Sequence, residues 1–125
     1  MSSSLRLRVN LTALENIALI RQYHAGLSWS RASAEAQQLL DLSGHGDCAM
    51  QRDEDLTSAQ RFAVKLARAI SQARPLLVID RPALMLPDMA YPRHLAALLE
   101  SLSERLPDYR ILDFDWHKPL YASLI

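Results

Sequence analysis

A capped amphipathic helix that leads directly into a short apolar strand is the feature that most restricts how this chain can fold. Residues 56–80 read "LTSAQRFAVKLARAISQARPLLVID". Thr57 and Gln60 form a capping box, in which each side chain satisfies a backbone N–H at the start of a helix. Apolar side chains then recur at helical spacing, and Pro75 ends the helix. The apolar positions are Phe62, Leu66, Ala69, Ile70 and Ala73. "LLVID" is too short for a helix and apolar on both faces, which is typical of a buried parallel strand.

The rest of the chain predicts three more helices and one more strand. Thr12 and Glu15 form a second capping box, which starts a helix in "NLTALENIALIRQYH". "SWSRASAEAQQLLDLS" predicts a helix that stops near Gly44, and "AYPRHLAALLESLSERL" predicts one with leucines in register and Pro92 in its first turn. "GHGDCAMQRDEDL" has no periodicity and predicts a loop, whereas "YRILDF" predicts the second strand.

This order of elements predicts an α/β fold that is predominantly helical, with a helical subdomain followed by a small strand–helix–strand unit. We expect a single domain over residues 1–125, with the helical part at 11–73 and a partial α/β part at 74–125. Half of the residues are hydrophobic and the formal net charge is zero. These values favour a globular protein and argue against nucleic acid or an anionic membrane as its main partner.

The cysteine content and the lack of long apolar segments predict where in the cell the protein is located. Cys48 is its only cysteine, so no disulfide can form within the chain, which fits a reducing cytosol. "MSSSLRLRVN" lacks the apolar run of a signal peptide, and no stretch approaches the roughly 20 apolar residues of a membrane span. We therefore expect a soluble, cytoplasmic protein.

From about residue 11 to residue 117, the chain resembles the second half of an ABC transporter ATP-binding subunit. "LTALENIAL" resembles the start of the helical subdomain of these proteins, and "LTSAQ" stands where they carry the signature LSGGQ. "ARAI" resembles the ARAL-type segment of the signature helix, and "LLVIDRP" stands where the Walker B strand ends in Asp-Glu-Pro. The resemblance implies the C-terminal half of a P-loop NTPase fold.

Three departures from the family restrict what the chain is expected to do. The Walker A loop, G-x-x-x-x-G-K-[ST], is absent, since none of Gly26, Gly44 and Gly46 begins or completes it. By the resemblance, Asp80 holds the Walker B position that would help to bind Mg²⁺. Arg81 replaces the glutamate that polarises the attacking water, and a guanidinium cannot accept a proton. Asp80 can equally be a strand-end residue that caps the following turn.

The signature is altered as well, because Ser58 and Ala59 replace its two glycines. Their Cβ atoms crowd the approach of a phosphate, and three carboxylates at residues 53–55 would repel it. The resemblance leaves Thr57, Ser58 and Gln60 as nucleotide-binding candidates that act in trans on a partner's ATP. The alternative is a well-capped core helix.

The sequence gives weaker support for a functional role of the other candidate residues. The resemblance offers His117 as a switch-like histidine, although an ungapped alignment puts Trp116 at that place, and Asp88 lies in a D-loop-like "MLPD". Asp113 and Asp115 are expected on an exposed strand face. The remaining histidines lack metal-ligand spacing and are expected at or near the surface; they are His24, His45 and His94. Cys48 lies in an acidic loop, which should raise its thiol pKa and disfavour a nucleophilic role.

We therefore expect a non-catalytic protein that acts by protein–protein interaction with a transporter permease or an intact ATPase subunit. It would need no cofactor of its own, would bind no nucleic acid and would reach the inner face of the membrane only through a permease. The alternative is an ATP-binding component whose nucleotide site, with ATP and Mg²⁺ at Asp80, is completed by another chain; a remnant without a preserved role is a third possibility. The open edge of "LLVID" must also be covered, by a second copy, by a partner, or by "SLRLRVN" as an added strand.

Overall fold

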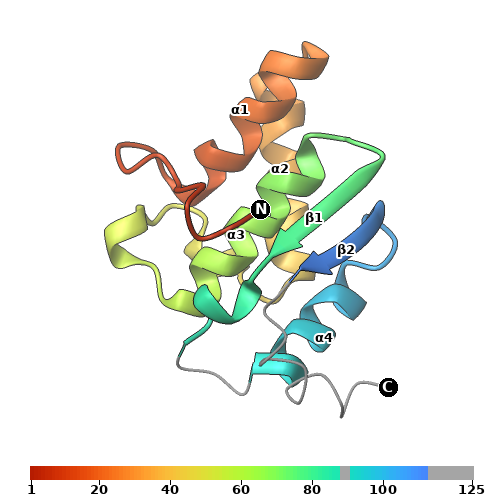
Figure 1. Cartoon of the computed structure of the whole chain (residues 1–125). Helices are drawn as coiled ribbons and strands as arrows, with labels where there is room; N and C mark the ends of the chain where they lie inside the picture. The colour runs from red at the N-terminus through yellow and green to blue at the C-terminus, as the bar shows by residue number, and fades with distance from the viewer. Residues whose placement is uncertain (88–90, 113–125) are drawn as a thin grey trace.

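The structure, a computed structural model, describes residues 1–87 and 91–112 (Figure 1). Its main elements, in chain order, are α1 (Ala13–Ala25), α2 (Trp29–Leu42), α3 (Ser58–Ser71), β1 (Leu76–Asp80), α4 (Tyr91–Ser101) and β2 (Asp108–Leu112). Short 3₁₀ turns occupy η1 (Gly46–Cys48), η2 (Asp53–Asp55) and η3 (Pro82–Leu84). This order confirms the predicted fold class, in which helices come first and a strand–helix–strand unit follows. Among the described residues, no helix is both long enough and apolar enough to cross a membrane.

Both predicted capping boxes are present. The Glu15 N–H donates to Thr12 Oγ1 at 3.1 Å, and the Thr12 N–H donates to Glu15 Oε1 at 3.0 Å. Thr57 and Gln60 make the same reciprocal pair at the start of α3. At the other end, α3 stops at Ser71, so the predicted last member of its apolar stripe, Ala73, lies outside the helix with φ at 53°.

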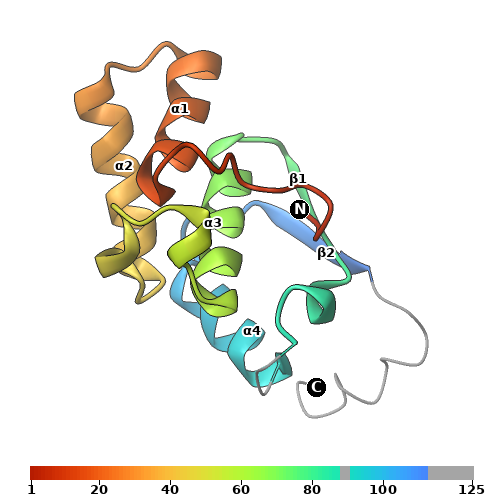
Figure 2. The same cartoon turned by 90° about the vertical axis from the view of Figure 1, so that its left-hand side faces the viewer.

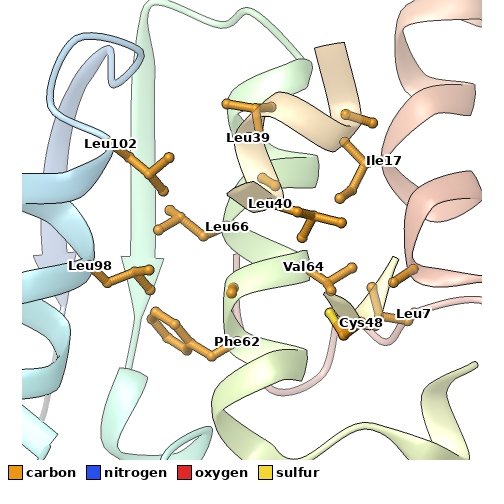
Figure 3. Close-up of a cluster of buried hydrophobic side chains, with 14 of the residues drawn as sticks. Leu7, Ile17, Leu39, Leu40, Cys48, Phe62, Val64, Leu66, Leu98 and Leu102 are labelled. Atoms are coloured by element: carbon orange, nitrogen blue, oxygen red, sulfur yellow. The ribbon is translucent and has the colours of Figure 1, made fainter. Parts of the chain in front are cut away.

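The helix α3 lies at the centre of the molecule and is buried on two sides. Figure 3 shows Phe62 and Leu66 on the side of α3 that faces Leu98 of α4 and Leu102 just after it, while Val64 points the opposite way, toward the first two helices. All six residues from 62 to 67 are consequently buried. The single predicted stripe was too narrow, because a helix with neighbours on both sides buries more than one face.

The two strands are parallel neighbours, connected through α4, with Leu76 opposite Asp108 and Ile79 opposite Ile111 (Figure 2). Leu77 and Ile79 are buried on the face that α3 and α4 cover, whereas Leu76 and Val78 are 47% and 36% exposed. The prediction that "LLVID" is buried on both faces is therefore wrong. Within the described residues, only one face of this sheet receives helices, so the other face stays open.

The N-terminal segment does not form the added strand that was one of the three alternatives for covering the edge of "LLVID". Residues 3–9 carry no strand, and of its alternating apolar residues only Leu7 is buried, while Leu5 and Val9 are exposed. The segment instead reaches β1 through a single residue: the Met1 amino group donates to Val78 O at 2.6 Å, and the Asp80 N–H donates to Met1 O at 2.8 Å. Figure 1 shows this terminus beside β1 and α3. The physical reason is that side chains of α3 bind the carbonyl groups a strand would use for its ladder, as described below.

Candidate functional site

The end of β1 carries Asp80 and Arg81, the two residues that the resemblance places at the Walker B position. Arg81 follows the strand with φ at 48° and ψ at 60°, a left-handed backbone conformation that costs a non-glycine residue about 1–2 kcal/mol. Its N–H donates to Leu112 O at 2.6 Å, so the turn is attached to the end of β2. This conformation directs the side chain of Arg81 back toward the residue that precedes it.

Asp80 and Arg81 form a two-pronged ion pair. Arg81 Nε lies 3.1 Å from Asp80 Oδ1, and Arg81 Nη2 lies 3.2 Å from Oδ2. Both carboxylate oxygens thus accept hydrogen bonds from one guanidinium, which is the geometry that arginine uses to neutralise an anion. The two side chains remain 34% and 40% exposed, so the pair contributes at most about 1 kcal/mol to stability.

This arrangement does not fit Mg²⁺. A magnesium ion needs free, negatively charged oxygen ligands at about 2.1 Å. Asp80 already uses both oxygens, and the permanent cation beside it would repel a second positive charge. The described part of the chain contains no group of three or more His, Cys, Asp or Glu side chains arranged to hold a metal ion. At the end of β1 both oxygens of Asp80 are therefore paired with Arg81, and a metal ion at Asp80 would have to displace this guanidinium.

The second candidate group lies at the N-terminus of α3. The Thr57 hydroxyl accepts from the Gln60 N–H at 3.1 Å, and Gln60 Oε1 accepts from the Thr57 N–H at 2.9 Å. Two of the three residues that the resemblance assigns to a nucleotide, Thr57 and Gln60, thus have their side chains engaged in the cap of their own helix. The turn η2 places Asp53, Glu54 and Asp55 directly before this cap, and their charges oppose the approach of a phosphate.

A hollow lies between α3 and the segment that follows β1. Its volume is about 210 Å³, and it is lined by Ser3, Ser58, Arg61, Phe62, Lys65, Leu84, Met85 and Pro87. Of the sequence-predicted residues, only Ser58 contributes to this wall; Thr57, Gln60, Asp80 and Arg81 do not. Among the described residues, the fold therefore brings Ser58 next to the segment that follows β1, but it does not bring Thr57, Gln60, Asp80 or Arg81 into the same hollow.

Several predicted residues lie outside the described residues. Asp88 falls between the two described ranges, and His117 follows them, as do Asp113, Asp115 and Trp116.

The histidines are less scattered than their spacing suggested. His24 is exposed, while His45 and His94 are partly buried. Burial lowers the pKa of His94, and the charge of His45 lowers it further. Within the described residues, Nε2 of His94 is buried and accepts or donates no hydrogen bond. The proximity of these two histidines could not be read from residues so far apart in the sequence.

Cys48 is fully buried against the helices, as Figure 3 shows. Its thiol pKa is raised, first by burial and then by the charge of Asp47. The direction agrees with the sequence prediction, but burial, which the sequence did not predict, is the larger cause. A raised pKa keeps the thiol protonated and disfavours a nucleophilic role.

Sequence reasoning missed a group of cations on α3 that holds the N-terminal segment. Lys65 Nζ donates to Ser2 O at 3.3 Å, and Arg68 donates to Arg6 O at 2.9 Å and to Leu5 O at 2.8 Å. Lys65 is 4% exposed. The available signal was a lysine in the middle of the apolar run "FAVKLA", where a buried helix face should carry no charge.

The amino-acid sequence of the chain is similar to those of known ABC transporter ATP-binding proteins. No protein-family model matches the chain. The chain is 34% identical over 95 residues to the methionine import ATP-binding protein MetN of Streptococcus pneumoniae strain R6, an alignment that covers 76% of this chain and 26% of that protein. It is 35% identical over 79 residues to an uncharacterized ABC transporter ATP-binding protein of Thermotoga maritima, covering 63% of this chain and 33% of the relative. The chain therefore spans only a quarter to a third of the length of these relatives.

Solved structures agree with these relatives. The dimeric structure of MJ0796, a bacterial ABC transporter cassette, superposes with a TM-score of 0.71 at 25% identity, covering 92% of this chain and 51% of that one. A putative metal-chelate type ABC transporter in an inward-facing conformation gives a TM-score of 0.65 at 24% identity, covering 82% of this chain and 42% of that one, which supports the fold alone.

Proposed function

Because this chain belongs to the ATP-binding cassettes of ABC transporters, of which it comprises the helical subdomain, the signature helix and the Walker B strand, we propose that it acts by protein–protein interaction and not by ATP hydrolysis. The partner would be a transporter permease or an intact ATPase subunit. The proposed location is the cytoplasm, at the inner face of the membrane when a permease is bound.

The observation that carries this proposal is the ion pair between Asp80 and Arg81. It supports a site without Mg²⁺ and without a general base, since both oxygens of Asp80 accept hydrogen bonds from Arg81. This pairing supports a chain that hydrolyses no ATP at Asp80 and needs no cofactor there.

The open face of the sheet supports an interaction role. Leu76, Val78 and Leu112 lie on the face of β1 and β2 that the helices leave uncovered, and they are 47%, 36% and 54% exposed. Parallel sheets are normally covered on both faces, because their strands are apolar on both sides. This open face therefore fits a protein surface that completes the layer.

The test has two arms. In the first, the purified chain is titrated with a fluorescent ATP analogue and Mg²⁺, and hydrolysis of ATP is followed in parallel. We expect neither saturable binding nor turnover up to millimolar nucleotide. Saturable binding at micromolar concentrations would contradict the proposal.

In the second arm, the chain is co-expressed with an intact ABC ATPase subunit and its permease, and complexes are separated by size-exclusion chromatography. We expect co-elution that weakens when the open sheet face is made polar by Val78→Thr together with Leu112→Thr. Tyr23→Ser is the matched control, because Tyr23 is an exposed aromatic residue on α1, away from the sheet. Equal co-elution of the sheet variant and the control would contradict a role for this face.

A second candidate function is an ATP-binding component whose site is completed by another chain. The exposed N-terminus of α3 favours it, since Thr57 is exposed and helix N-termini attract phosphates. It predicts association with an intact ATPase subunit that depends on ATP. Association that is equal with and without ATP would exclude this candidate and leave the first.

A further inference from the structure

The lysine buried in α3 is the feature that neither proposed function uses. Lys65 is 4% exposed, yet among the described residues its ammonium group has a single hydrogen-bond acceptor, Ser2 O at 3.3 Å. An ammonium group can donate three hydrogen bonds. A buried charge with one neutral partner is far from satisfied.

The charges around Lys65 are mostly of the same sign. Its pKa is lowered by burial first, then by the charges of Arg68 and Arg61, and further by Arg6, while Asp53 alone acts in the opposite direction. Asp53 is itself occupied, because Arg61 Nε lies 2.7 Å from its Oδ1. The region therefore carries a positive excess that an anion would relieve.

The cations around Lys65 differ in how many of their N–H donors already make hydrogen bonds. Arg68 is engaged by the carbonyls of Leu5 and Arg6. Arg61 is engaged through Nε and Nη2 by Asp53 and the carbonyl of Leu56, which leaves its Nη1 without a hydrogen bond among the described residues. The guanidinium group of Arg6, by contrast, makes no hydrogen bond or ion pair within the part of the chain that the structure describes.

A cavity lies between these groups. It has a volume of about 200 Å³ and is lined by Ser3, Arg6, Leu7, Asp53, Arg61 and Lys65. The neighbouring hollow of about 210 Å³ shares Ser3, Arg61 and Lys65 with it. Lys65 and Arg61 thus stand between two spaces, one polar and one with an apolar wall at Phe62, Leu84 and Met85.

We propose that this cavity binds a small oxyanion, inorganic phosphate or the phosphate group of a small ester, through the Lys65 ammonium, the Arg6 and Arg61 guanidinium groups and the Ser3 hydroxyl. Guanidinium groups match the paired oxygens of a phosphate, and lysine adds a point charge. The apolar wall of the neighbouring hollow suits the organic part of an ester. The site is separate from the cap at Thr57 and from Asp80, neither of which lines it.

Phosphate binding by the full chain tests the proposal. Inorganic phosphate is titrated at constant ionic strength, with chloride as the replaced anion, and binding is followed by calorimetry and by backbone amide shifts. We expect saturation below about 1 mM, which corresponds to roughly 4 kcal/mol of binding free energy. We also expect the amide shifts to concentrate at residues 3–7 and 61–65. Failure to saturate, or shifts spread over the whole surface, would overturn the proposal.

Two variants identify the residues that bind. Lys65→Met keeps the length of the side chain and should weaken binding at least tenfold. Arg6→Gln changes an exposed side chain, and it should weaken binding at least threefold even if Lys65→Met fails to fold. Arg105→Gln removes an exposed cation beyond α4 and should change nothing. Wild-type affinity in Arg6→Gln and Lys65→Met, or equal weakening in Arg105→Gln, would refute the site.

Parallel titrations distinguish the sources of the anion. Methyl phosphate should bind at least as tightly as inorganic phosphate if the neighbouring hollow receives the ester. Acetate should bind at least tenfold more weakly, since a single carboxylate cannot serve three cations. Binding of ATP with no binding of phosphate or methyl phosphate would overturn the proposal in favour of a nucleotide site.

Discussion

The guanidinium of Arg81 lies against the carboxylate of Asp80, the residue directly before it, with Nε 3.1 Å from Oδ1 and Nη2 3.2 Å from Oδ2. Neighbouring residues at the end of a strand normally point to opposite sides. Here the left-handed backbone of Arg81 removes that alternation and brings the two charges together. Arg81, which stands where the resemblance expects the Walker B glutamate, thus binds the carboxylate of Asp80.

Replacing this cation should create an affinity for divalent metal. In Arg81→Glu, Asp80 loses its guanidinium partner and gains a second carboxylate, so we expect measurable binding of Mn²⁺ by water proton relaxation, with none in the wild-type chain. Arg93→Glu makes the same charge change at an exposed position of α4 and should bind no metal. Equal Mn²⁺ binding by the wild-type chain and Arg81→Glu would mean that the ion pair does not block the site.

The cap of α3 should contribute to stability independently of any nucleotide. Thr57→Ala removes the hydroxyl that accepts from the Gln60 N–H, so we expect the free energy of unfolding to fall by about 1 kcal/mol. Thr57→Ser retains the hydroxyl and should stay within about 0.5 kcal/mol of the wild-type chain. Urea unfolding followed by circular dichroism measures both. An unchanged midpoint in Thr57→Ala would show that the hydroxyl stabilises nothing in the free protein.

The two-sided burial of α3 makes its apolar residues the most sensitive positions of the core. Leu66 is fully buried and faces α4 (Figure 3), so Leu66→Ala should lower the free energy of unfolding by about 2–5 kcal/mol. Leu42→Ala, at an exposed leucine of α2, should change it by less than about 0.5 kcal/mol. Denaturant titration of both variants decides the point, and equal losses would contradict the central position of α3.

Because of His94, the free energy of unfolding should decrease at acidic pH. Its pKa in the folded state lies below the ordinary value of 6.5, first through burial and then through His45. Between the folded and ordinary values the unfolded chain binds more protons, so stability should fall as the pH drops below 6.5. His94→Gln should flatten this dependence, measured as unfolding free energies at about pH 7.5 and about pH 5. His24→Gln, at an exposed histidine, should leave the dependence as in the wild-type chain.

Local signals predicted most of the elements and failed where burial depends on neighbours. The capping boxes at Thr12 and Thr57 lie within four residues each, so the sequence contains all of their atoms, and both form as expected. The open face at Leu76 and Val78 was missed because an apolar sequence shows that a strand can be buried but does not show which element covers each of its faces. The alternative of an added N-terminal strand fails because α3 supplies donors to the carbonyls of Ser2, Leu5 and Arg6, and no pattern within residues 1–9 contains those donors.

By itself, the sequence determined the order of elements and the resemblance to the ATP-binding cassettes, and it showed that an arginine, Arg81, follows Asp80 at the end of the first strand. Each of these is a property of residues that adjoin in the chain. Only the tertiary structure decided that Arg81 binds Asp80, that Lys65 is buried among cations, and that His45 lies near His94. These relationships depend on backbone conformation and on distances between segments far apart in sequence. Charge and burial act through space, so their consequences appear only when the chain has folded.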